Sequence, residues 1–85
     1  MKTQLLRHLT ACASAYGHEN NLSQRDVAAL ALGDRIFFER VENPEKTFTI
    51  RTYDRGMRWF SSHWPSALAW PLDVPRPTIL ESVAA

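Results

Sequence analysis

The side chains that could carry out chemistry in this 85-residue chain are few and far apart. Cys12 is the only cysteine, so no second thiolate exists for a disulfide or for the usual four-ligand zinc site. The three histidines, His8, His18 and His63, follow no spacing typical of metal ligands. No nucleophile–base pair, glycine-rich phosphate loop or carboxylate pair stands out. We therefore expect no metal, no cofactor and no enzymatic activity.

Charge is nearly balanced along the chain, with a formal net charge of +1 at pH 7. A strongly basic balance, which would by itself indicate nucleic-acid binding, is missing. The distribution is uneven, so any anion-binding surface must be local. Arginines occur in the second half at Arg51, Arg55, Arg58 and Arg76, and glutamates cluster near the middle at Glu39, Glu42 and Glu45.

Size and hydropathy predict one small folded domain. Hydrophobic residues make up 45 % of the chain and aromatic residues 11 %, which is enough for a packed core. The N-terminal stretch is not expected to be a secretory signal, because Arg7 and His8 interrupt its apolar run too early. No run of about 18 apolar residues predicts a membrane span, and the solitary Cys12 suits a reducing compartment. We expect a soluble, cytoplasmic protein with no membrane partner.

Apolar spacing predicts a first helix over residues 3–16, ended by Gly17. A last helix is predicted to follow Thr49 as its N-cap, because apolar residues again recur every three or four positions. The expected buried stripe of the first helix is Leu5, Leu6, Leu9, Ala13 and Tyr16, and that of the last is Ile50, Tyr53, Met57 and Phe60.

Between these helices, two short helices are expected to meet at a glycine turn. Ser23 can cap a helix over residues 24–32, with Asp26 as the acidic partner of a capping box and Gly33 as the stop. Asp34 can cap a second helix over residues 35–42. The inward-facing residues are expected to be Val27, Leu30 and Ala31 on the first of these helices, and Phe38 and Val41 on the second.

This segment resembles the helix-turn-helix of lambda-repressor-like (Xre-like) transcription regulators of the small prophage type in bacteria. The resemblance rests on the Leu-Ser-Gln-Arg-Asp-Val-Ala stretch at residues 22–28, on Gly33, and on Arg-Val-Glu-Asn at residues 40–43. It extends over residues 22–60 and implies an all-α domain of four to five helices. The implied partner is double-stranded DNA, bound in a sequence-specific way to regulate transcription, with the second motif helix in the major groove.

If the resemblance holds, the DNA-binding residues come from both motif helices and the start of the last helix. They are Gln24, Arg25, Asp34, Arg35, Phe37, Glu39, Thr49, Arg51 and Arg55. Ile36 and Phe37, together with acidic Asp34 and Glu39, are unusual on a groove-facing helix, because carboxylates are repelled by phosphate. That face also favours an alternative, a protein-interaction module that docks on RNA polymerase or on another regulator.

The C-terminal part of the chain is rich in tryptophan and proline. Four X-Pro pairs within residues 64–77 favour extended or turn conformations, so we divide the chain into a domain at 1–64 and a tail at 65–85. The tail is expected to wrap over the helices or to pack on a partner chain. Repressor-like regulators commonly dimerise through this region, and the resemblance implies a homodimer interface at Trp59, Phe60, Trp64 and Trp70.

Overall fold

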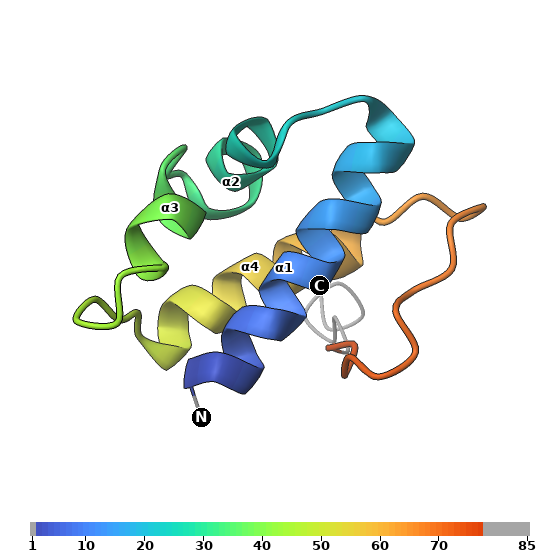
Figure 1. Ribbon diagram of the computed structural model, residues 1–85. Coiled ribbons are helices and arrows are strands. Elements are labelled where there is room, and N and C mark those ends of the chain that lie inside the picture. The colour runs from blue at the N-terminus through green and yellow to red at the C-terminus, as the bar shows by residue number, and fades with distance from the viewer. Residues whose placement is uncertain (1, 78–85) are drawn as a thin grey trace, which may run out of the picture.

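The computed structural model describes residues 2–77 and is all-helical over that range, with four helices and no strand (Figure 1). The helices are α1 (Lys2–Asn20), α2 (Gln24–Leu32), α3 (Phe37–Val41) and α4 (Ile50–His63). Helix α1 packs against α2 and α4, and α2 also packs against α4 and α3. Within the described part of the chain, none of these helices combines the length and the apolar character that a bilayer crossing requires.

The core draws on all four helices. Leu9, Cys12 and Phe60 are fully buried where α1 meets α4. Burial raises the pKa of the Cys12 thiol to about 12, so the thiol is neutral at physiological pH. The other buried hydrophobic residues are Ala13, Val27, Ala28, Ala31, Leu32, Phe37, Phe38, Val41, Met57, Trp64 and Val74.

Helix α1 is longer than expected, and the predicted stop at Gly17 is wrong. The helix continues to Asn20 and is followed by Asn21 in the left-handed region, at φ 58°. Gly17 is instead needed for close approach: a Cβ atom there would lie 2.7 Å from the carbonyl oxygen of Leu22. The amide of Leu22 donates to the carbonyl of Gly17 at 2.8 Å, so the chain returns directly against this residue.

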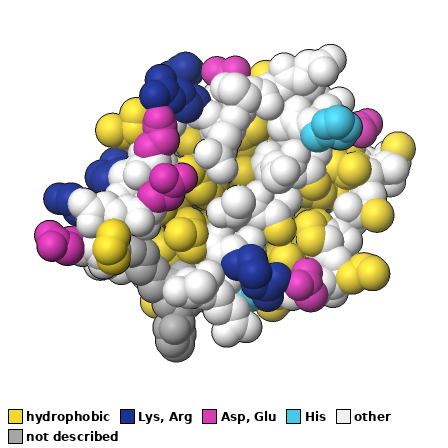
Figure 2. All heavy atoms as spheres, in the orientation of Figure 1, with side chains coloured by type: hydrophobic (Ala, Val, Ile, Leu, Met, Phe, Trp, Pro, Cys, Tyr) yellow, Lys and Arg dark blue, Asp and Glu magenta, His cyan; other side chains and the backbone are white. Residues whose placement is uncertain are grey.

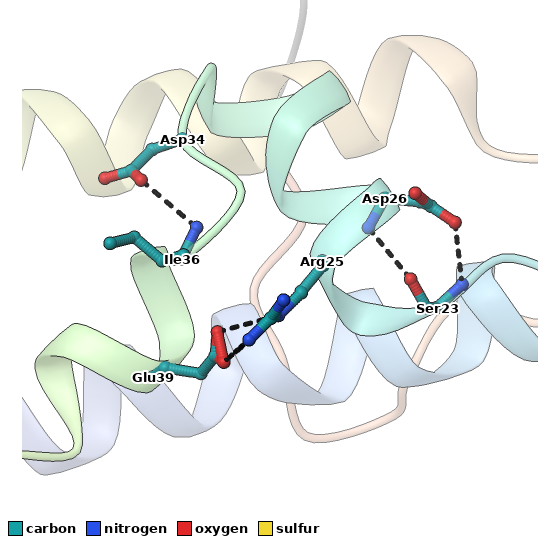
Figure 3. A network of polar contacts seen from close by, with 6 residues as sticks. All are labelled: Ser23, Arg25, Asp26, Asp34, Ile36 and Glu39. Atoms are coloured by element: carbon teal, nitrogen blue, oxygen red, sulfur yellow. Dashed lines mark hydrogen bonds and ion pairs between the residues drawn. The ribbon is translucent and has the colours of Figure 1, made fainter.

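Helix α2 has the predicted bounds and both predicted caps. The amide of Asp26 donates to the hydroxyl of Ser23 at 3.1 Å, and the Asp26 carboxylate accepts from the amide of Ser23 at 3.4 Å (Figure 3). Gly33 ends the helix with a φ of 69°, and its amide donates to the carbonyl of Ala29. The expected burial of Leu30 is wrong, because this side chain is 51 % exposed.

Helix α3 begins at Phe37, two residues later than predicted, and the expected helix cap at Asp34 is wrong. The Asp34 carboxylate accepts from the amide of Ile36 at 3.2 Å and thereby closes the turn before the helix. Phe38 and Val41 are buried as expected. The short helix is therefore held in place by its apolar side and not by a side-chain cap.

Helix α4 has the predicted N-cap, because the amide of Thr52 donates to the hydroxyl of Thr49 at 3.1 Å. Met57 and Phe60 are buried as expected. The expected burial of Ile50 is wrong, since this side chain at the first turn is 60 % exposed. The buried stripe of α4 therefore lies along its middle and C-terminal part.

Residues 65–77 of the predicted tail fold back over the helices, together with Trp64 at the end of the predicted domain. Trp64 and Val74 are buried in the core, and the indole of Trp70 donates to the carbonyl of Val74 at 2.8 Å. The Arg7 guanidinium on α1 donates to the Asp73 carboxylate at 2.6 Å. These contacts place residues 65–77 on the helices of the same chain, and residues 78–85 lie outside the described range.

Candidate nucleic-acid interface

The two motif helices are joined on their exposed side by a bidentate ion pair. Arg25, in the first turn of α2, donates to both carboxylate oxygens of Glu39 on α3, with N–O distances of 2.6 to 3.1 Å (Figure 3). These hydrogen bonds hold the pKa of Glu39 below its usual value, so the carboxylate is charged at neutral pH. Both side chains remain about half exposed. The pair is therefore open to solvent on the outer surface of the motif.

Two further ion pairs neutralise the remaining arginines of the motif. Arg35 donates to the Asp26 carboxylate at 3.1 Å, and Arg40 pairs with Asp34. The pKa of Asp26 is lowered chiefly by its hydrogen bonds with Ser23 and further by Arg35. The pKa of Asp34 is lowered chiefly by the hydrogen bond from Arg40. Each of these arginines therefore has a carboxylate partner.

The motif surface consequently carries no excess of positive charge. Residues 22–43 contain three arginines and four carboxylates, which gives a formal charge of −1. Figure 2 shows basic and acidic side chains lying beside one another on this face, without a broad area of one sign. Because exposed ion pairs are weak, a phosphate can compete with a carboxylate for these arginines.

Of the six predicted DNA-binding residues on the motif, four are exposed, Asp34 is half-buried and Phe37 is buried. Gln24 is exposed at the start of α2, as are Arg25, Arg35 and Glu39. Phe37 was expected on the exposed face and is 1 % exposed, so that prediction is wrong. Its ring packs edge-on against Phe38 and Phe48, and its role is to anchor α3.

Of the predicted residues at the start of α4, Arg55 lies beside the motif turn. Arg51 and Arg55 are exposed, and neither side chain forms a hydrogen bond or ion pair within the described range. A Cβ atom on Gly33 would lie 3.2 Å from a terminal nitrogen of Arg55, so this side chain reaches the turn between α2 and α3. The hydroxyl of Thr49 is already engaged as the helix cap.

The chain has no match in the comparisons with known proteins. No family model, no curated protein and no solved structure matches it.

The predicted dimer residues divide into buried and half-buried side chains. Phe60 is fully buried between α1 and α4, so its expected place on a surface is wrong. Trp64 is only 9 % exposed, and its indole donates to the carbonyl of Leu68 within the same chain. Trp59 and Trp70 are half-buried; Trp59 stacks on His63 at 4.3 Å between ring centroids. Of the four predicted dimer residues, Trp59 and Trp70 are the two that remain partly exposed.

The pairing of each motif arginine with a carboxylate was not predicted. Arg25 and Glu39 are 14 positions apart, and Arg35 and Asp26 are 9 apart, so no helical spacing links them. Arg40, which pairs with Asp34, was missed as a site residue altogether. The alternation of arginines and acidic residues through the motif was the available signal, but only the fold fixes the pairs.

One buried polar group lies outside this surface. The ring of His8 is 4 % exposed, and its Nδ1 shares a hydrogen bond of 2.9 Å with the hydroxyl of Tyr53. Its Nε2 has no hydrogen-bond partner in the described part of the chain. No group of three or more potential metal ligands occurs among the described residues, so this histidine belongs to the α1–α4 contact.

Proposed function

We propose that the chain is a sequence-specific DNA-binding transcription regulator that uses α2 and α3 as a lambda-repressor-like helix-turn-helix. One observation carries the proposal: polar side chains of α2 and α3 meet on one exposed surface, as the Arg25–Glu39 contact requires. Phe37, Phe38 and Val41 anchor the opposite side of α3 in the core. This arrangement leaves the outer side of α3 for the major groove and the start of α2 for the DNA backbone.

The chemistry of the exposed side chains supports this role. The amide of Gln24 can both donate to and accept from a base edge or a phosphate. The Arg35 side chain is 59 % exposed and lies in the turn before α3, where a guanidinium can contact a base or a phosphate. Its contact with Asp26 is exposed and therefore exchangeable for a stronger contact with DNA.

The proposal is tested by selecting duplexes from a random pool with the purified chain and measuring affinity for the selected sequence by fluorescence anisotropy. We expect tighter binding to the selected duplex than to a scrambled one, and Arg35→Ala should weaken it by about tenfold or more. The matched control is Arg7→Gln, which removes one exposed arginine paired to the tail. Equal affinity for selected and scrambled duplexes across salt concentrations would contradict sequence-specific recognition.

A second function, docking on RNA polymerase or on another regulator, is favoured by a different observation. Leu30 and Ile36 are each 51 % exposed, and the motif surface is slightly acidic. Exposed apolar residues among charge-paired ones suit a protein partner. Binding of purified RNA polymerase that Ile36→Asp abolishes and Arg35→Ala preserves would support this function instead of DNA binding.

We also propose that the regulator acts as a homodimer, with Trp59 and Trp70 in the interface. A two-fold dimer would place two motifs on a palindromic site. Sedimentation of the wild type and of Trp59→Ala tests this directly. A monomer at every concentration with and without the duplex would argue against the dimer and leave recognition by a single motif.

A further inference from the structure

The arginines of the motif and of α4 fall into two groups by their partners. Arg25, Arg35 and Arg40 each pair with a carboxylate inside the motif. On α4, Arg58 donates to Asp54 one turn earlier, at 2.9 Å. Arg51 and Arg55 differ, because within residues 2–77 neither side chain forms an ion pair or a hydrogen bond.

These two arginines share one exposed face beside the motif. They are four positions apart on a 14-residue helix, so their side chains are neighbours on its surface. The Arg55 guanidinium also reaches the Gly33 turn, where a terminal nitrogen lies 3.2 Å from the place of a glycine Cβ atom. The Arg51–Arg55 face is therefore continuous with the turn that joins α2 to α3.

The two groups differ in what they lose when a polyanion binds. A paired arginine must exchange a carboxylate for a phosphate, and the released carboxylate then repels the backbone. An unpaired arginine exchanges only water, and its planar guanidinium can donate two hydrogen bonds to one phosphate. Arg51 and Arg55 therefore offer the more favourable phosphate contacts on this side of the molecule.

We propose that the Arg51–Arg55 face binds the sugar-phosphate backbone of duplex DNA next to the groove that α3 would enter, and supplies the sequence-independent part of the affinity. This inference rests on the proposed DNA-binding function. Phosphates carry the charge complementary to this face, and their spacing along a strand lets neighbouring groups meet two arginines one helical turn apart.

The experiment compares the salt dependence of duplex binding for wild type and variants. The logarithm of the binding constant falls linearly with the logarithm of the salt concentration, and each lost phosphate contact makes this slope shallower by about 0.9. We expect Arg51→Gln alone to make the slope shallower by about one, and Arg51→Gln/Arg55→Gln to make it shallower by about two. Both variants should lower the affinity for the selected duplex and for the scrambled duplex by the same factor. Arg58→Gln on the same helix is the matched control and should leave the slope unchanged.

Charge-retaining variants separate the phosphate contact from a structural role of Arg55 at the turn. Arg51→Lys/Arg55→Lys should keep the wild-type salt slope. If it does so while the slope of Arg51→Gln/Arg55→Gln is shallower by about two, the inference holds. An unchanged slope in folded Arg51→Gln would overturn it, as would tighter binding of duplex RNA than of duplex DNA.

Failure of this inference differs from failure of the proposed function. If wild type binds no duplex at low salt, both are wrong. If wild type selects a sequence and Arg51→Gln/Arg55→Gln keeps the wild-type salt slope, only the assignment of the Arg51–Arg55 face is wrong. Circular dichroism of each variant establishes that it is folded before binding is measured.

Discussion

Arg25 at the start of α2 donates three hydrogen bonds to the carboxylate of Glu39 on α3, the shortest at 2.6 Å. The two residues are 14 positions apart, so the contact exists only because the motif brings both helices to one surface. It ties the helices together and engages the Arg25 guanidinium. Under the proposed function, the Glu39 carboxylate therefore competes with DNA phosphate for Arg25.

Replacement of Glu39 by Gln should strengthen duplex binding. The neutral amide leaves Arg25 free for phosphate and removes a charge that repels the backbone. We expect a higher affinity for selected and scrambled duplexes, and a salt slope that is steeper by about one. The measurement is fluorescence anisotropy at several salt concentrations.

The control for this prediction is Glu42→Gln, which removes an exposed carboxylate beyond the end of α3. It tests whether long-range charge alone explains the effect. Equal gains in the two variants would mean that the Arg25 contact is irrelevant to DNA binding.

Acidification should destabilise the fold through its paired carboxylates. The pKa values of Asp34 and Glu39 are below their usual 3.8 and 4.5, because arginines donate hydrogen bonds to the charged forms. A depressed pKa in the folded state contributes stability that is complete above the usual pKa and is lost as pH falls through the folded value. We therefore expect the free energy of unfolding to be constant from pH 7 to about pH 5 and to fall below about pH 4.

Urea unfolding between pH 6 and pH 2.5 measures this dependence. Asp34→Asn should flatten part of the decline, because the amide oxygen can still accept from the Ile36 amide but no longer titrates. Glu45→Gln, in the exposed loop before α4, should leave the curve unchanged. A decline of the same size in Asp34→Asn would show that the Arg40–Asp34 pair does not contribute.

Local signals in the sequence were sufficient for the helix ends that depend on near neighbours. The capping box of Ser23 and Asp26 involves residues three positions apart, and Thr49 likewise caps the amide of Thr52. Gly33 ends α2 because glycine adopts the left-handed conformation without steric cost. These features follow from short-range chemistry and were predicted correctly.

Features set by distant parts of the chain were not predictable in this way. Phe37 is buried because Phe48, from the loop before α4, packs on its ring at 5.5 Å between centroids. Leu30 and Ile50 fit the helical pattern of their neighbours, yet no other element covers them and both are exposed. For the site, residue types indicated which side chains could contact DNA, but the ion pairs that engage them depend on tertiary placement.

The requirement for glycine at position 17 also depends on a tertiary contact, and replacing Gly17 tests its effect on stability. An alanine in a helix is ordinarily more stable than a glycine by about 0.5 to 1 kcal/mol. At Gly17 the added Cβ would lie 2.7 Å from the Leu22 carbonyl and 3.3 Å from a methyl group of Val27. We expect Gly17→Ala to lower the free energy of unfolding by about 1 to 3 kcal/mol. Urea unfolding measures it.

The control is Ser14→Ala, on the exposed side of the same helix, which should change stability by less than about 0.5 kcal/mol. A gain in stability for Gly17→Ala would mean that the α1–α2 connection moves freely to accept the methyl group.

Phe60 separates a core residue from a dimer contact. Its side chain is fully buried and packs edge-on against Trp59 and Trp64. Truncation of a buried Phe to Ala costs about 3 to 5 kcal/mol, so Phe60→Ala should lower or abolish stability. The milder Phe60→Leu should remain folded and unfold at lower urea, with a midpoint shift from wild type that is the same at every protein concentration.

Trp59→Ala is the matched comparison on the same helix, since the half-buried indole stacks on His63 and reaches solvent. The apparent stability of a dimer rises with protein concentration through mass action. Loss of an interface therefore makes the difference from wild type grow with protein concentration, whereas loss of core packing leaves that difference constant. If the shift between wild type and Phe60→Leu grows with protein concentration while that of Trp59→Ala stays constant, then Phe60 and not Trp59 contributes to self-association. That outcome would require the α1–α4 contact to open when two chains meet.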